Sequence, residues 1–128
     1  MNRVFLTKTF SRWMRKSNVT EDSICSAVSE MSNGLIDADL GGNIFKKRVA
    51  VNNKGKRAGA RTIVATQLLD RWFFLYGFEK NERSNISKEE LKLFQELGSD
   101  FLGLNDSQLK SAMLAGNILE VCNGNNSA

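Results

Sequence analysis

The stretch that decides the fold is IFKKRVAVNNKGKRAGARTIVATQLLDRWFFLYGF, residues 44–78. Apolar side chains recur with a period of two in residues 44–51 and 62–68, which is the pattern of half-buried strands. A glycine-containing segment, residues 52–60, predicts a turn between them. Residues 71–78 are apolar on both faces, as expected for a central strand covered on both sides. The stretch therefore predicts an antiparallel meander of three strands.

A block of positive charge spans the first hairpin of this meander. Residues 46–61 hold seven basic residues and no acidic one, whereas the other 112 residues carry eleven basic and fourteen acidic groups. Such a block attracts polyanions through phosphate neutralisation, which predicts a nucleic-acid partner, and a solvated basic loop is the equally weighted alternative. The basic residues of the block are Lys46, Lys47, Arg48, Lys54, Lys56, Arg57 and Arg61.

The strand register divides the basic block. Lys46 and Arg48 project from one face of the first strand, while Lys47 shares the other face with apolar side chains. Arg61 opens the returning strand. Residues held on strands are better placed for chemistry, and residues on a turn are better placed to capture phosphate. We expect the turn to present Lys54, Lys56 and Arg57.

The segment before the meander predicts a short strand at residues 3–6 and two helices. Phe10, Trp13 and Met14 form one apolar face of the first helix. Thr20 is a good N-cap for the second helix, which we expect to end near Met31.

The segment after the meander predicts two more helices. Each begins with a capping box, formed by Ser87 with Glu90 and by Asn105 with Gln108, and Phe94, Leu97, Phe101 and Leu104 are expected to face the core. Residues 118–121 are expected to return to the sheet.

These elements predict the α+β class: a small antiparallel sheet with two N-terminal helices packed on it and one or two C-terminal helices. We expect one domain over residues 1–122 and a disordered polar tail at residues 123–128.

Composition excludes several kinds of chemistry. Histidine is absent, which removes Ser-His and Cys-His catalysis and HExxH zinc sites, and no phosphate-binding glycine motif occurs. Cys25 and Cys122 lack a metal-ligand spacing, so we expect reduced, buried thiols. The sequence contains neither a long apolar run nor a secretory signal, and it predicts a cytoplasmic protein without membrane contact, metal or cofactor.

Two patterns favour structural interpretations over functional ones. Asp37 and Asp39 are spaced as a possible cation site or acid–base pair, but a capped loop is the favoured interpretation. Strand alternation predicts four aromatic rings on one face, where they could form a base-stacking platform, although core packing is favoured. The four are Trp72, Phe74, Tyr76 and Phe78.

A second charged cluster, EKNER at residues 79–83, leaves the end of the third strand, where it can meet Arg61. A dense cationic surface can cleave RNA without histidine, because the 2′-hydroxyl of the substrate is an internal nucleophile. Arginine can stabilise the charged phosphorane, and a lysine among like charges can exchange protons. The alternative for Lys80 and Glu82 is a surface ion pair.

Three segments together resemble the RelE/ParE superfamily of bacterial toxin–antitoxin toxins, in its RelE-like branch. They are LIDADLGGNIFKKRVA (35–50), GKRAGARTIVA (55–65) and DRWFFLYGFEKNERSNI (70–86), and the likeness covers nearly the whole chain. The resemblance implies a RelE-like fold and an mRNA interferase, often acting on ribosome-bound mRNA to inhibit translation. It also implies a cognate antitoxin that holds the toxin inactive, in a possible hetero-oligomer.

The resemblance also implies roles for individual residues. Lys46 and Arg48 match the basic residues that position and activate the scissile phosphate, with Lys47 as the alternative in register. Arg61 matches the arginine that stabilises the transition state. Arg83, with Lys80 as its alternative, matches the arginine after the central strand. Because the chain lacks histidine and its C-terminal segment lacks tyrosine, the resemblance identifies no general base.

Two alternatives to an endoribonuclease remain from the sequence. The ParE branch is similar in fold and inhibits DNA gyrase without being an enzyme, and a nucleic-acid-binding accessory protein would also use the basic block. The cationic set favours the nuclease, because a gyrase inhibitor needs no cationic cluster at the sheet.

Overall fold

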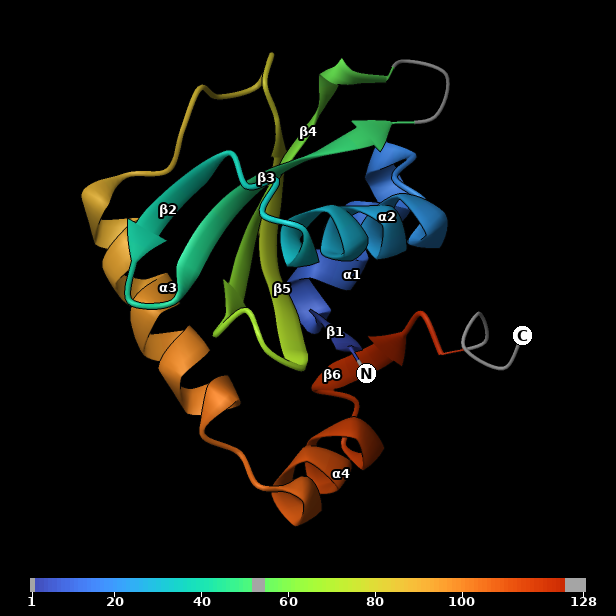
Figure 1. Ribbon diagram of the computed structural model, residues 1–128, viewed down its shortest axis with the longest axis vertical. Coiled ribbons are helices and arrows are strands. Elements are labelled where there is room, and N and C mark those ends of the chain that lie inside the picture. The colour runs from blue at the N-terminus through green and yellow to red at the C-terminus, as the bar shows by residue number, and fades with distance from the viewer. Residues whose placement is uncertain (1, 52–54, 124–128) are drawn as a thin grey trace.

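The computed structural model describes residues 2–51 and 55–123, with the backbone alone for residues 55–58. Apart from Asn123, the polar tail predicted above lies outside the described residues. The elements follow one another as in Figure 1. They are β1 (Arg3–Thr7), α1 (Lys8–Ser17), α2 (Glu21–Ser32), β2 (Ala38–Gly41), β3 (Ile44–Val51), β4 (Gly55–Thr66), β5 (Arg71–Glu79), α3 (Lys88–Leu102), α4 (Asp106–Leu114) and β6 (Ile118–Val121).

The described strands form one sheet in the order β2-β3-β4-β5-β1-β6. The predicted meander of β3, β4 and β5 is confirmed, with antiparallel pairing at both steps. β1 lies parallel to β5, and β6 returns antiparallel to β1, as the short C-terminal segment predicted. The α+β class and the mostly antiparallel sheet are therefore confirmed.

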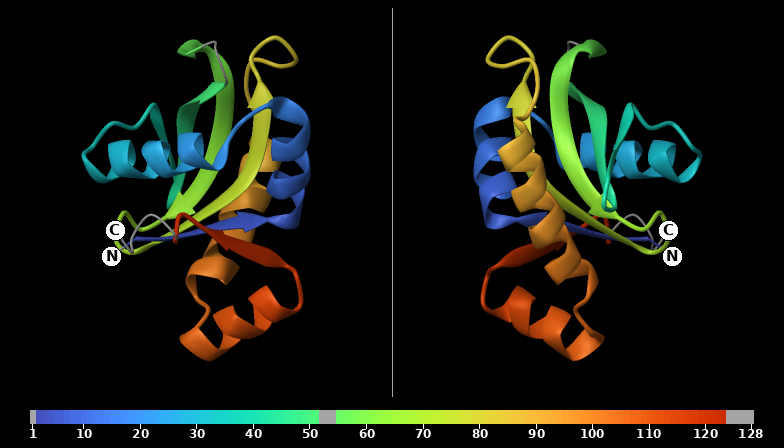
Figure 2. Two further views of the ribbon diagram at one scale, coloured as in Figure 1. Left: turned by 90° about the vertical axis from the view of Figure 1, so that its right-hand side faces the viewer. Right: turned by 90° about the vertical axis from the view of Figure 1, so that its left-hand side faces the viewer.

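Helices cover both faces of the sheet and bury an apolar core on each. α1 and α2 lie on one face and α3 on the other, so that Figure 2 looks onto the first face in its left view and onto the second in its right view. Alternation along β5 serves both cores: Trp72 and Phe74 point to the α1 side, and Phe73 and Leu75 to the α3 side. A strand that is apolar on both faces thus fits its central position.

Side-chain caps fix where the helices begin. Thr20 accepts a hydrogen bond from the Ser23 amide at the start of α2. The two predicted capping boxes are both present, at the starts of α3 and α4. These contacts satisfy amide groups that a helix end leaves without partners. No helix in the described part of the chain is long and apolar enough to cross a membrane.

The first hairpin and the segment before it, residues 38–41, differ from the prediction. The backbone of residues 55–60 continues β4 and pairs with β3, so the predicted turn over residues 52–60 was too long. Residues 38–41 form the edge strand β2 beside β3, where no strand was predicted. A four-residue strand with a bulge against its neighbour is too short for a period-two pattern.

A bulge in β5 changes the predicted face of two aromatic side chains. Ile63 pairs with Tyr76 but Val64 pairs with Phe74, so one extra residue of β5 interrupts the alternation. Tyr76 and Phe78 therefore join the α3 side, while Phe74 stays on the α1 side. The expected single aromatic face is wrong, because a bulge has no signature in a continuous apolar run. The α3 stripe also differs, since Leu97 is exposed.

The two cysteines are joined in a disulfide, contrary to the expectation of reduced thiols. Cys25 lies on α2 and Cys122 follows β6, with their Cα atoms 5.8 Å apart although they are 97 positions apart in sequence. The sheet causes this approach, because β6 pairs with β1 and this pairing brings Cys122, at the end of β6, beside α2. Sequence spacing carries no information about such a contact.

We expect the disulfide to stabilise the fold strongly, since it closes a loop of 97 positions. The variant with Cys25→Ser and Cys122→Ser should lose about 2 to 5 kcal/mol of unfolding free energy. Guanidinium unfolding of the oxidised and reduced protein and of the double variant measures this loss. Equal stability of the oxidised protein and the variant would contradict the pairing.

Gly77 should tolerate no side chain. A Cβ atom placed there would overlap ring carbons of Trp13 on α1. We expect Gly77→Ala to cost about 1 to 3 kcal/mol through overpacking. In chemical unfolding, the double variant with Trp13→Leu should lose less than the sum of the two single losses, because the smaller side chain relieves the clash. Additive losses would exclude this contact as the cause.

Candidate functional site

Three of the predicted cations lie on the same face of the sheet, on the α3 side. Arg48 on β3 and Arg61 on β4 are directly opposite each other, and Lys46 is opposite Ile63 of the α3-side core. Arg61 is partly buried, and its Nη1 is fully buried with no hydrogen-bond partner among the described residues. The register therefore assembles the set predicted from alternation and leaves one donor nitrogen of Arg61 without a described partner.

Arg48 is anchored at the sheet edge by an acidic residue. Its Nε lies 3.0 Å from Asp37 Oδ1, and its backbone amide donates to the other carboxylate oxygen. The Arg48 side chain remains 44% exposed. The Asp37 carboxylate thus offsets part of the charge that Arg48 and Arg61 place side by side.

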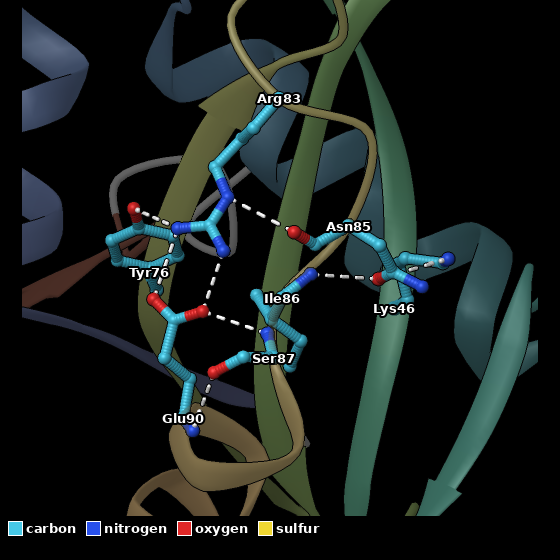
Figure 3. Close-up of polar contacts among 7 residues, drawn as sticks. All are labelled: Lys46, Tyr76, Arg83, Asn85, Ile86, Ser87 and Glu90. Atoms are coloured by element: carbon cyan, nitrogen blue, oxygen red, sulfur yellow. Dashed lines mark hydrogen bonds and ion pairs between the residues drawn. The ribbon is translucent and has the colours of Figure 1, made fainter.

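Arg83 belongs to the same region through the loop that follows β5. Arg61 pairs with Phe78 near the end of β5, so the exit of that strand lies beside Arg61, as expected. The loop folds back, and Figure 3 shows the Arg83 side chain between Tyr76 and Glu90. Its Nη1 donates to Tyr76 Oη at 3.2 Å and to Glu90 Oε2 at 2.9 Å, its Nη2 donates to Glu90 Oε1, and its Nε donates to the Asn85 carbonyl.

These contacts commit most of the Arg83 guanidinium. Four of its five N–H groups have partners, which leaves one on Nη2. The hydrogen bonds from Arg83, followed by that from the Ser87 amide, lower the pKa of Glu90 to about 2. The same carboxylate raises the pKa of Arg83 above its ordinary value. Glu90 therefore combines two functions, capping α3 and holding Arg83.

Asn85 connects the loop to the strand cations, as Figure 3 shows. Its Oδ1 lies 3.5 Å from Lys46 Nζ and accepts the Ile86 amide at 2.9 Å. Neither Asn85 nor Tyr76 was predicted as a site residue. Tyr76, for which core packing was favoured, is only partly buried, and its hydroxyl accepts a hydrogen bond from Arg83. The β5 bulge and the loop path decide both positions, and the sequence shows neither.

Lys47 lies on the opposite face, which differs from its prediction as an RNA-binding residue. It is only 4% exposed, its Nζ is 2.8 Å from Glu30 Oε1 on α2, and it donates to the Leu35 carbonyl. Strand alternation turns it away from its two basic neighbours. Lys47 therefore pairs with α2 and is not available to a ligand on the α3 side.

The structure describes the other predicted RNA-binding residues only in part. Lys80 is exposed in the turn after β5. Lys54 and the side chains of Lys56 and Arg57 lie outside the described residues, although the backbone of the last two continues β4.

The acidic residues near the site form no metal centre in the described part of the chain. Asp37 pairs with Arg48, and Asp39 accepts a hydrogen bond from the Gly41 amide at 3.0 Å. The second contact is that of a capped loop. The cations on this face are guanidinium and ammonium groups, which can bind an anion.

Fold and site together define a small α+β protein with a cationic cluster held on one face of its sheet. The family model for the RelE toxin of the RelE/RelB toxin–antitoxin system matches residues 2–121, and the chain belongs to this family. The resemblance stated from the sequence is therefore confirmed. The protein is the toxin of a toxin–antitoxin system, and the family implies a cognate antitoxin as its partner. A comparison with curated proteins gives no match.

The Arg83–Glu90 pair predicts a pH-dependent contribution to stability. Because the folded pKa of Glu90 is depressed to about 2, its contribution is complete above the ordinary carboxylate pKa and declines as the pH falls towards 2. Glu90→Gln should destabilise the protein at pH 7, and the stability difference from wild type should shrink between pH 5 and pH 2. Chemical unfolding at several pH values measures this difference.

Glu89→Gln is the matched control, since Glu89 also lies in the first turn of α3 and is exposed. Its stability difference from wild type should change less over the same pH range. Equal profiles for the two variants would show that the pairing with Arg83 does not stabilise the fold.

Proposed function

We propose that this toxin is a metal-independent endoribonuclease that cleaves mRNA on the ribosome and so inhibits translation. The observation that carries the proposal is the buried Arg61 Nη1, without a described hydrogen-bond partner, beside Arg48 on a face that also holds Lys46. An unpaired buried donor costs free energy, and a phosphate oxygen would satisfy it once the Arg61 side chain turns towards the ligand. Phosphate is the anion that an mRNA substrate supplies at every nucleotide.

The chemistry needs no histidine. The 2′-hydroxyl of the substrate loses its proton to water and its oxygen attacks the adjacent phosphorus, and the bond to the 5′-oxygen of the next nucleotide breaks. The products are a 2′,3′-cyclic phosphate and a 5′-hydroxyl. Arg61 stabilises the charge of the phosphorane, Arg48 holds the phosphate, and Lys46 supplies a proton to the leaving 5′-oxygen. Lys54, Lys56, Arg57 and Lys80 are proposed to contact the RNA backbone on either side.

Arg83 is proposed to act in two ways. Its contacts with Tyr76, Asn85 and Glu90 fix the loop after β5 beside the strand cations. The N–H group that remains on Nη2 can donate to the same phosphate as Arg61. Because the loop is held before substrate binds, little ordering cost remains for the reaction.

Arg61→Ala should lower the rate of RNA cleavage by about 100- to 1,000-fold, the loss typical of removing one donor to a developing oxyanion. Lys110→Ala on α4, which is also an exposed cation in the wild type, should leave the rate unchanged. Mapping of 5′ ends on an mRNA, free and bound to purified ribosomes, measures the rate. Chelation of divalent metals should not slow cleavage of the free mRNA.

Growth arrest without RNA cleavage would instead support a gyrase inhibitor of the ParE kind. Cleavage that survives both Arg61→Ala and Arg83→Ala would remove this face of the sheet as the catalytic site.

A further inference from the structure

A cleft of about 470 Å³ lies on the face of the sheet opposite to Arg61, between α1 and the last strand. Its apolar lining comes from Leu6, Met14, Val19 and Leu119, which belong to β1, α1, the α1–α2 connection and β6. Arg15 and polar side chains complete the wall. We call this cleft the β6 groove.

The groove exists because the helices leave Leu119 of β6 uncovered. α1 packs over β5, where Phe10 meets Phe74 at 5.3 Å between ring centroids. Leu119 is directly opposite Leu6 in the β1–β6 pair, yet Leu119 is 56% exposed and Leu6 only 2%. In the left view of Figure 2, β6 (red) lies at the lower margin of the sheet, below α1 and α2. Apolar surface is therefore open at a sheet edge, where backbone groups are also available for pairing.

The helix beside the groove is positively charged, and its Arg15 lines the groove. α1 contains four basic residues and no acidic one, and all four basic side chains are exposed. Among the described residues, none of the four takes part in an ion pair; they are Lys8, Arg12, Arg15 and Lys16. An apolar floor beside a row of free cations complements a segment with apolar side chains flanked by carboxylates.

The strand that forms the groove is anchored before any partner binds. The Cys25–Cys122 disulfide joins the end of β6 to α2, and the Cys122 amide donates to Glu21 at 3.0 Å. Arg3 on β1 pairs with Glu120 on β6 at 2.9 Å. A preformed wall reduces the ordering cost of binding.

We propose that the β6 groove is the docking site for an acidic segment of the cognate antitoxin that carries apolar side chains. A polypeptide fits this surface better than RNA does, because Leu119 and Met14 offer apolar contact where a nucleic acid would present phosphates. Leu6 packs in the core on the α1 side of the sheet. Ile63 packs in the core on the α3 side, and Arg61, two positions earlier in β4, lies on the same face as Ile63. The antitoxin segment can therefore bind while Arg61 stays uncovered, and the proposal does not depend on RNA cleavage.

The test uses the product of the reading frame adjacent to that of the toxin, co-expressed with the full chain and purified as a complex. Hydrogen exchange of the toxin, alone and in the complex, should show added protection in β6 and α1. Leu119→Asp, and Arg12→Glu with Arg15→Glu, should each weaken the complex at least tenfold in a binding titration. The altered side chains are all exposed in the wild type, and a thermal melt of each variant checks its folding.

Matched controls lie on α3 and α4. Leu114→Asp removes an exposed leucine outside the groove, and Lys92→Glu with Lys110→Glu reverses two exposed cations there. Both should leave the affinity unchanged.

Unchanged affinity of Leu119→Asp, or protection confined to the α3 side, would overturn the proposal. The proposal would also be overturned if the double variant with Lys46→Ala and Arg61→Ala weakened the complex as much as Leu119→Asp does. The surface would be assigned to RNA instead if a short single-stranded RNA protected α1 from exchange and the variant with Arg12→Glu and Arg15→Glu no longer bound it. In that case the same variant would still bind the antitoxin normally.

Discussion

The candidate site depends on one unfavourable arrangement, the placement of Arg48 directly opposite Arg61 across the β3–β4 pair. Like charges in such a position destabilise a sheet, and the buried Nη1 of Arg61 adds the cost of a donor without a described partner. Asp37 offsets part of this cost through Arg48 only. The pairing persists because it is fixed by the register of the whole hairpin, whose other side chains fill both cores. A phosphate between the arginines would relieve it.

The region around this pair is held by polar contacts rather than by apolar packing alone. Glu90 caps α3 and binds Arg83, Arg83 binds the Asn85 carbonyl, and the Asn85 side chain reaches Lys46. Through these contacts Glu90 connects the start of α3 to Lys46 on β3, although β4 separates β3 from β5 in the sheet. The loop after β5 is positioned by this chain of contacts, which explains how a segment without regular structure can contribute to a site that requires fixed geometry.

The sequence predicted what local rules control. Alternation placed Lys46 and Arg48 on one face, and the capping boxes fixed the starts of α3 and α4. The prediction from sequence failed where contacts between distant segments decide the position of a side chain. The β5 bulge moved Tyr76 to the α3 side, and the return of β6 brought Cys122 to Cys25. Lys47 shows a third cause: its position followed from alternation, but its partner Glu30 lies on a helix whose packing the strand pattern does not encode.

The two faces of the sheet constrain how an antitoxin in the β6 groove could inhibit the proposed cleavage. Arg61 lies on the α3 side of the sheet and the groove lies on the α1 side. Carboxylates beside α1 would therefore contact neither Arg61 nor a phosphate bound to it. Inhibition from the groove would have to come from the bulk of the antitoxin, which would keep the toxin from its ribosome-bound substrate while leaving the cationic face chemically competent.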